Sequence, residues 1–307
     1  MLLVSFVALV AAGALVQRAS TVSLPGASPP PPAPPVPLPA GPPVLAVKVD
    51  NAPDARPPTG IGAADVVYVE PVEAGITRLI AVFGSQYPPV VGPVRSARET
   101  DLRLLPQFGR PTLAFSGAAP ELLPRLDSAV LRNGSQAREP GAYYRGEGDA
   151  PHNLFVRPGR LPAGQPWSPN APLSFGSVPA GGTPSPYREV RYSNTTVGFQ
   201  WSAADRRWLV SFDGRPYVAA DGGRLGPATV VLQRVPERDS ELSDSAGNRT
   251  PYVETTGAGR ALVLRDGRSF EARWSRPSPE AGTTYTTPSG RPLQFAPGQG
   301  WTVLAPE

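Results

Sequence analysis

The chain has 307 residues, 40% of them hydrophobic, so it can bury one or two ordinary cores and is not a disordered protein. It contains no cysteine, which excludes disulfides, thiolate nucleophiles and zinc sites built on sulfur. The net charge of +4 comes from dispersed arginines, with Lys48 the only lysine, and lacks the basic stripe of a nucleic-acid-binding protein. An anionic wall polymer or lipid surface fits this charge better, although a base bias of the genome would also enrich arginine.

Residues 1–23 are expected to form a signal peptide or a membrane anchor. Residues 1–16 are apolar or small throughout, and Gln17 and Arg18 end the run. This length falls just short of the roughly 17–25 residues of a membrane-spanning helix, and residues 12–14 offer a small-residue cleavage site, so both interpretations stay open. In either case the chain is predicted to be extracytoplasmic, secreted or anchored by residues 1–16, with membrane contact only through this segment.

A proline-rich spacer is predicted at residues 24–43, which are LPGASPPPPAPPVPLPAGPP. Such a segment cannot form a helix or a sheet ladder and favours polyproline II, which rises about 3.1 Å per residue. The spacer would hold a folded domain some distance from the membrane.

The folded part is predicted to begin with a mixed lobe at residues 44–160. Apolar and β-branched runs predict strands at residues 44–49, 66–69, 78–83 and 112–115. Helical spacing predicts helices at residues 96–105 and 120–131. Because these elements lack a repeating βαβ rhythm, the sequence predicts an α+β fold with a mixed α/β N-terminal lobe.

A second, mostly antiparallel β lobe is predicted at residues 187–307, after a Pro/Gly-rich connection at residues 161–186. The dipeptides Asp213-Gly214 and Asp266-Gly267 lie between apolar alternating segments, which is typical of hairpin turns, and Ser289-Gly290 is a weaker example. The tryptophans are expected to form the core of this lobe, with carbohydrate stacking by one of them as the alternative: Trp201, Trp208, Trp274 and Trp301.

The segment from Gly92 to Arg98 is the most informative local feature. It contains Arg95, Ser96 and Arg98 in a loop that leads into a predicted helix. Backbone amides at a helix start and two forked guanidinium groups can bind a phosphate or carboxylate, so an anion site is predicted here. The alternative is that both arginines pair internally with acidic residues of neighbouring loops.

Polar residues also gather where the predicted strands end, and loops after strands often carry binding sites. Acids and an arginine in such a cluster suit polar-ligand binding or acid/base chemistry, whereas turn capping and solvation are the structural alternative. These candidates are Asp50, Asn51, Glu70, Glu73, Thr77 and Arg78.

His152 is the only histidine, and it could serve as a general base for Ser96 or Ser116. No GxSxG elbow is present, and a histidine that fixes its loop by hydrogen bonding is the alternative. A single histidine excludes the usual zinc triads, and no twelve-residue calcium loop is visible among the oxygen ligands. No metal and no cofactor are therefore predicted.

Several separated blocks resemble the YerB-like family of bacterial envelope proteins, whose members are mostly lipoproteins with an N-terminal domain of unknown function and a companion C-terminal domain. The blocks are VKVDNAPDARPPTGIGAADVVYVEPVEAGITRLIAVF, GPVRSARETD, YYR and PHNLF, and later PGQGWTVL. The blocks YYR and PHNLF add Tyr144, Arg145 and Asn153 to the ligand-binding candidates. The resemblance implies an α+β fold and an extracytoplasmic location but no established activity. Because cysteine is absent, no lipid-modified cysteine is expected, and anchorage would come from residues 1–16.

Two functions are compatible with these features. The favoured hypothesis is a non-catalytic module that binds an anionic cell-wall component or an envelope protein. The alternative is a hydrolase or lyase acting on peptidoglycan or another envelope glycan through Glu70 and Glu73. These two lie only three residues apart, so Asp50 or Asp65 would have to complete a pair of facing carboxylates.

Overall fold

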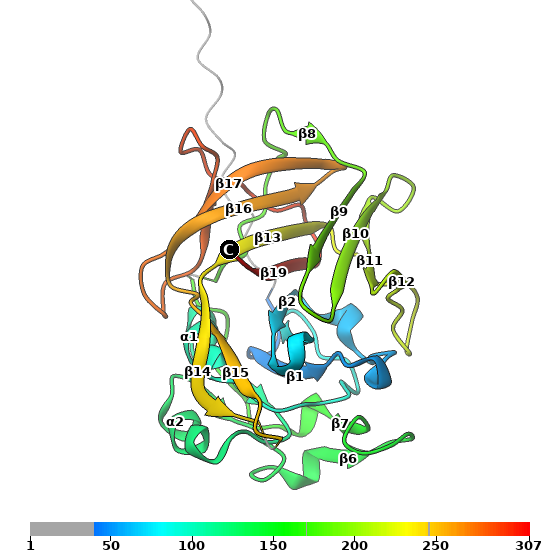
Figure 1. The fold of residues 1–307 in the computed structure, drawn as a ribbon, viewed down its shortest axis with the longest axis vertical. Coiled ribbons are helices and arrows are strands. Elements are labelled where there is room, and N and C mark those ends of the chain that lie inside the picture. The colour runs from blue at the N-terminus through cyan, green and yellow to red at the C-terminus, as the bar shows by residue number, and fades with distance from the viewer. Residues whose placement is uncertain (1–39, 170, 245) are drawn as a thin grey trace, which may run out of the picture. The chain divides into compact units, whose positions relative to one another are not determined.

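The computed structural model describes residues 40–307 except residues 170 and 245 (Figure 1). The predicted signal or anchor segment, residues 1–23, and most of the predicted spacer lie outside the described residues. Within the described part, every helix is too short or too polar to cross a lipid bilayer.

One large mixed sheet runs through both halves of the described sequence. It contains eleven strands. They are β1 Leu45–Asp50, β2 Val66–Pro71, β3 Thr77–Phe83, β4 Thr112–Ala114, β5 Arg132–Asn133, β8 Thr183–Pro184, β13 Thr229–Val235, β16 Gly257–Arg265, β17 Arg268–Arg276, β18 Thr284–Thr286 and β19 Gly300–Pro306. Their order is β18-β17-β16-β13-β19-β2-β3-β1-β4-β5, and β8 pairs with β17.

The strand β19 joins the two halves of this sheet. It runs parallel to β2 on one side, with Val303 opposite Val69, and parallel to β13 on the other, with Val303 opposite Leu232. The strands of residues 187–307 therefore continue the sheet that the strands of residues 44–160 begin. Apart from the β13–β19 pair, the later strands of this sheet pair antiparallel with one another.

The remaining strands form three small sheets. The first has four strands in the order β12-β11-β10-β9, and the other two are hairpins. Their bounds are β9 Tyr187–Arg191, β10 Thr196–Ser202, β11 Arg207–Phe212, β12 Arg215–Pro216, β6 Tyr143–Arg145 with β7 Leu154–Val156, and β14 Glu237–Ser243 with β15 Arg249–Val253.

The two predicted α-helices are present but short. α1 is Glu99–Leu104 and α2 is Leu123–Ser128. α1 ends early because Pro106 has no amide hydrogen and restricts the residue before it, so the chain continues as a 3₁₀ turn. The 3₁₀ segments are Pro53–Ala55, Ile61–Ala63, Glu73–Gly75, Leu105–Phe108, Pro120–Leu122, Pro140–Ala142 and Pro158–Arg160. Strands thus predominate, and the α+β prediction overstates the helical content.

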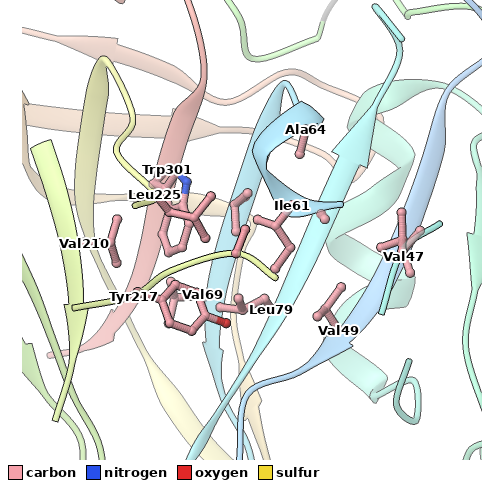
Figure 2. Packing of buried hydrophobic residues seen from close by; sticks show 14 of the residues in the cluster. Val47, Val49, Ile61, Ala64, Val69, Leu79, Val210, Tyr217, Leu225 and Trp301 are labelled. Carbon is pink, nitrogen blue, oxygen red and sulfur yellow. The ribbon is translucent and has the colours of Figure 1, made fainter. Parts of the chain in front are cut away.

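The large sheet is buried on both faces. Side chains alternate along β1, so Val47 and Val49 pack toward the four-stranded sheet while Ala46 packs toward the helices (Figure 2). All six residues of β1 are buried, so its side chains on both faces are covered, including the charged Lys48 and Asp50. The described part of the chain therefore has two apolar cores, one on each face of the sheet.

The hairpin predictions and the core role of three tryptophans are confirmed. Asp213 and Asp266 adopt φ angles of 54° and 50° in the two-residue turns after β11 and β16. Trp208, Trp274 and Trp301 are almost fully buried. Trp201 is half-buried and packs against the same core as Trp208, and Ser289-Gly290 lies in the turn closed by the bridge from Thr286 to Pro292.

Candidate anion-binding site

Three neighbouring strands bring charged side chains together at one end of the large sheet. Arg78 of β3 lies opposite Asp50 of β1 and opposite Glu70 of β2. Lys48 lies two residues before Asp50 and so shares its face of the sheet. Ile80, two residues after Arg78, belongs to the core on the helix side, which places this charged cluster on the face covered by α1.

Lys48 is the cation at the buried end of the cluster. It is fully buried, donates to Glu70 and also donates to Asp101 Oδ1 of α1 at 2.9 Å. Asp101 Oδ2 in turn accepts the backbone amide of Arg98 at 2.8 Å, which fixes the start of α1. Burial lowers the pKa of Lys48 to about 8, and the Asp101 carboxylate opposes that shift. The ammonium group remains charged at neutral pH, as a buried ion pair requires.

Glu73 forms a second buried ion pair. Its carboxylate accepts from Arg98 Nη2 at 2.7 Å and lies 2.6 Å from Arg98 Nε. Thr250 of β15 donates its hydroxyl to the same carboxylate, so the C-terminal half of the chain completes this contact. Burial alone would raise the pKa of Glu73, but the hydrogen bond and charge of Arg98 and the Thr250 hydroxyl outweigh it and hold the pKa below its usual value.

The lowered pKa of Glu73 predicts a pH dependence of stability. A carboxyl whose pKa is lower in the folded state adds stability above its unfolded pKa, near 4.5, and loses it as the pH falls through the folded pKa. Glu73→Gln is therefore expected to be about 2 kcal/mol less stable than the parent at pH 7. This difference should shrink below pH 4.5 in urea unfolding series. Glu280→Gln, at an exposed position, is the control, and its stability should equal that of the parent at every pH. If the stability loss of Glu73→Gln is the same at acid pH as at pH 7, the lowered pKa of Glu73 is contradicted.

Asp50 holds two partners that come from distant loops. Its Oδ2 lies 3.1 Å from Arg95 Nε and 2.8 Å from His152 Nδ1, and its Oδ1 accepts the amide of Ala52. The Asp50 carboxylate thus occupies Nδ1 of His152 and fixes the orientation of the imidazole ring. Residues 92–98, which carry Arg95, are tied down by backbone bonds such as Arg95 N to Lys48 O at 2.9 Å.

A cavity of about 350 Å³ opens beside this network. Arg78, Arg95 and Arg98 form one wall together with Ser96. The rest of the lining is part apolar and part polar and includes residues of the segment before α2 and of the β14–β15 hairpin, which extends beside α1 and α2 (Figure 1). The other lining residues are Ala97, Glu99, Ala118, Ala119, Pro120, Leu122, Leu242, Ser243, Asp244 and Thr250.

Arg78 is the arginine of this wall with the fewest protein partners. It is 6% exposed, its Nε and Nη1 atoms have no hydrogen-bond acceptor, and Nη1 lies 3.8 Å from Glu73 Oε2. Among the described residues, five of the ten buried side-chain atoms without a hydrogen-bond partner belong to this network. Burial and the Arg98 charge lower the pKa of Arg78 to about 9, yet the group stays cationic at neutral pH. A buried cation with unmet donors beside a cavity favours an external acceptor.

The predicted candidates fall into four sets. Arg95, Ser96 and Arg98 line the cavity with Arg78, while Asp50, Glu70, Glu73 and His152 join the ion-pair network behind it. Asn51 and Thr77 bond to each other at 2.8 Å. The other three serve the β6–β7 hairpin: Tyr144 stacks on Phe155, and Asn153 accepts from Arg145 at 2.6 Å.

Two details of the predicted anion site need correction. The alternative of internal pairing holds for both loop arginines, because Arg95 meets Asp50 and Arg98 meets Glu73. The start of α1 is not available to a ligand, since the helix has only six residues and Asp101 already accepts the Arg98 amide. The arginine side chains of the cavity, and not a helix terminus, supply the positive charge.

Three contributors were not predicted. Lys48 could have been found from the sequence, because a lysine within an otherwise apolar buried strand requires acidic partners. Asp101 was part of a predicted helix but had no visible partner in the sequence. Thr250 had no signal, because its contact with Glu73 joins residues 177 positions apart.

The described residues show no group of three or more histidine or acidic side chains arranged to hold a metal ion. Each carboxylate that was considered for acid/base work contacts a cation: Glu70 meets Lys48, Glu73 meets Arg98 and Asp50 meets Arg95. For Glu73, whose pKa is lowered, this pairing favours the ionised form and opposes proton donation near neutral pH.

Comparison with known proteins identifies the family. Residues 36–167 match the family model described as "Protein of unknown function (DUF3048) N-terminal domain", and residues 188–302 match the corresponding C-terminal domain. The chain belongs to the DUF3048 family. The resemblance to YerB-like proteins noted from the sequence blocks is thereby confirmed.

Two comparisons with one relative agree with the family assignment. The chain is 28% identical over 277 residues to "Putative lipoprotein YerB" of Bacillus subtilis (strain 168), covering 86% of this chain and 81% of that protein. The crystal structure of the YerB protein from Bacillus subtilis matches with a TM-score of 0.73 and 23% identity, over 87% of this chain and 92% of that chain. The structural match shows that this member of the DUF3048 family has the YerB fold.

Proposed function

We propose that this protein is an exported cell-envelope protein whose folded part binds an anionic envelope component, without catalysis, in the cavity walled by Arg78, Arg95 and Arg98. The observation that carries the proposal is the buried Arg78 guanidinium, whose Nε and Nη1 atoms lack acceptors beside the cavity. A carboxylate or phosphate oxygen in the cavity would pair with the charge of this guanidinium, and arginine is the side chain best suited to such oxygens.

The envelope location rests on two independent features. Residues 1–16 have the composition of an export signal or anchor. The YerB relative is described by its name as a lipoprotein, which is a protein of the outer side of a membrane. A wall component or an envelope protein is therefore the proposed source of the anion.

Glycan hydrolysis is the weaker proposal. It needs a carboxyl group that is protonated near neutral pH, as the acid of a glycosidase is. Glu73 has a lowered pKa, and Glu70 is held by Lys48. No feature of the described site favours a protonated acid.

Binding is expected to depend on Arg78. Titrating the purified full-length protein with acetate and with inorganic phosphate should raise its melting temperature, since a ligand at 100 times its Kd stabilises by about 2.7 kcal/mol. Arg78→Met, which keeps much of the side-chain volume but removes the charge, should abolish this shift. Its fold should survive because Asp50, Glu70 and Glu73 keep Arg95, Lys48 and Arg98 as partners.

Arg138→Gln is the matched control, since Arg138 is exposed, pairs with Asp127 and lies outside the lining of the cavity. It should leave the response to both anions unchanged. Equal responses from the parent and from Arg78→Met, or no response to either anion in the parent, would refute binding at this cavity.

A further inference from the structure

The charges around the cavity limit how much negative charge it can accept. The buried network contains four cations and four carboxylates, so it is balanced as a whole: Lys48, Arg78, Arg95 and Arg98 against Asp50, Glu70, Glu73 and Asp101. The attraction for an anion is therefore local and comes from the arginines that face the cavity. Each additional negative charge on a ligand would enter a partly buried site with no further cation to balance it.

Two more carboxylates line the same cavity and oppose a highly charged ligand. Glu99 pairs with Arg125 at 2.8 Å and accepts from Ser240, and Asp244 accepts the amides of its own turn. Arg98 is among the groups that lower the pKa of Asp244, so the two charges are near each other. These two carboxylates repel a phosphate dianion more strongly than a singly charged carboxylate.

Part of the lining of the cavity is apolar. Ala118, Ala119, Pro120 and Leu122 form it on one side, and Leu242 of β14 adds to it from the C-terminal half. A cavity of about 350 Å³ is at the small end of the range for ligand pockets, roughly 300–1,000 Å³. The site therefore suits a short aliphatic group attached to the anion.

Polar groups of the lining can receive an amide. Ser96 and Ser243 also line the cavity. Serine hydroxyls both donate and accept, so they can bond the N–H and C=O of a peptide group. A carboxylate, a small aliphatic side chain and an amide are the three features of a peptide carboxyl terminus.

We infer that the ligand of this cavity is the free carboxyl terminus of a peptide that ends in a small aliphatic residue. This inference rests on the proposed function and specifies its ligand. The carboxylate pairs with the Arg78 guanidinium, and the aliphatic side chain contacts the apolar part of the lining, which includes Leu122 and Leu242. The ligand is singly charged at this end, in keeping with the balanced network behind the arginines.

The test compares four small probes on the full-length protein by isothermal titration calorimetry: N-acetyl-alanine, N-acetyl-alanine amide, inorganic phosphate and dimethyl phosphate. N-acetyl-alanine should bind, and the amide should bind at least about tenfold more weakly because it lacks the charge that Arg78 recognises. Both phosphates should bind more weakly than N-acetyl-alanine. Arg78→Met should lose binding of N-acetyl-alanine.

Leu242→Ser separates recognition of the side chain from recognition of the anion. Leu242 is only partly buried, so the variant should fold, bind acetate like the parent and bind N-acetyl-alanine more weakly. If inorganic or dimethyl phosphate binds as tightly as N-acetyl-alanine and this binding depends on Arg78, the peptide inference is overturned while anion binding stands. If the amide binds as well as the acid, the inference is also overturned. If no probe binds, both the inference and the proposed function fail.

Discussion

Lys48→Met is expected to lower the free energy of unfolding by about 3–5 kcal/mol, the cost of leaving a buried ion-pair partner uncompensated. Lys48 is fully buried and is the cation that Glu70 and Asp101 share. Methionine fills a similar volume, so the loss would come from the two carboxylates rather than from a cavity. Urea unfolding of the parent and the variant at pH 7 measures the difference.

Two further variants make the Lys48 result specific. Arg138→Gln breaks an exposed ion pair and should change stability by no more than about 0.5–1 kcal/mol. Adding Glu70→Gln to Lys48→Met should recover part of the loss, because one of the uncompensated charges is removed. A Lys48→Met protein as stable as the parent would mean that the two carboxylates do not depend on this lysine.

Trp301→Ala is expected to cost about 3–5 kcal/mol, the usual range for removing a large buried aromatic side chain. Trp301 is 1% exposed, lies edge-on to Phe199 and Tyr217, and donates Nε1–H to Gln299 at 2.8 Å. It belongs to β19, the strand that joins the two halves of the large sheet, and the cavity would open on the face that packs against Phe199 of β10 and Tyr217 (Figure 2).

The location of Trp301 predicts how the stability loss is distributed. Hydrogen exchange should speed up together in the amides of β3 and of β16. The strand β19 lies between β2 and β13 and connects the strands on its two sides. Trp201→Ala is the control: Trp201 is half-buried, so its removal should cost less and should not couple the two regions. Faster exchange confined to β16 and its neighbours would argue that the two halves of the sheet are energetically independent.

Much of the local structure could be predicted because local residue patterns decide it. The β-branched run before Asp50 forms β1, and Asp-Gly pairs form the two hairpin turns, since both depend on residues adjacent in sequence. α1 was predicted too long mainly at its start, because Arg98 adopts an extended conformation and the helix begins only at Glu99.

The site could be predicted in composition but not in pairing. Polar residues at strand ends identified Asp50, Glu70 and Arg78, because strands that neighbour one another bring their ends together. Which acid meets which arginine depends on strand order, and the insertion of β19 beside β2 joins residues more than two hundred positions apart. Such contacts leave no periodic trace in a single sequence, so the role of Thr250 at Glu73 was also invisible.

The place of β19 also sets when this protein can finish folding. Its partner β2 ends at Pro71, and β19 begins only at Gly300, so a ribosome working at about 5–20 residues per second needs on the order of 10–50 s to make the intervening chain. Sheets of this kind fold in milliseconds to seconds once their strands are present. During synthesis, β2 therefore has an open edge for far longer than folding itself takes, and open strand edges invite pairing with other chains. Protection of that edge by a chaperone, or export before folding, is a requirement that this topology places on the cell.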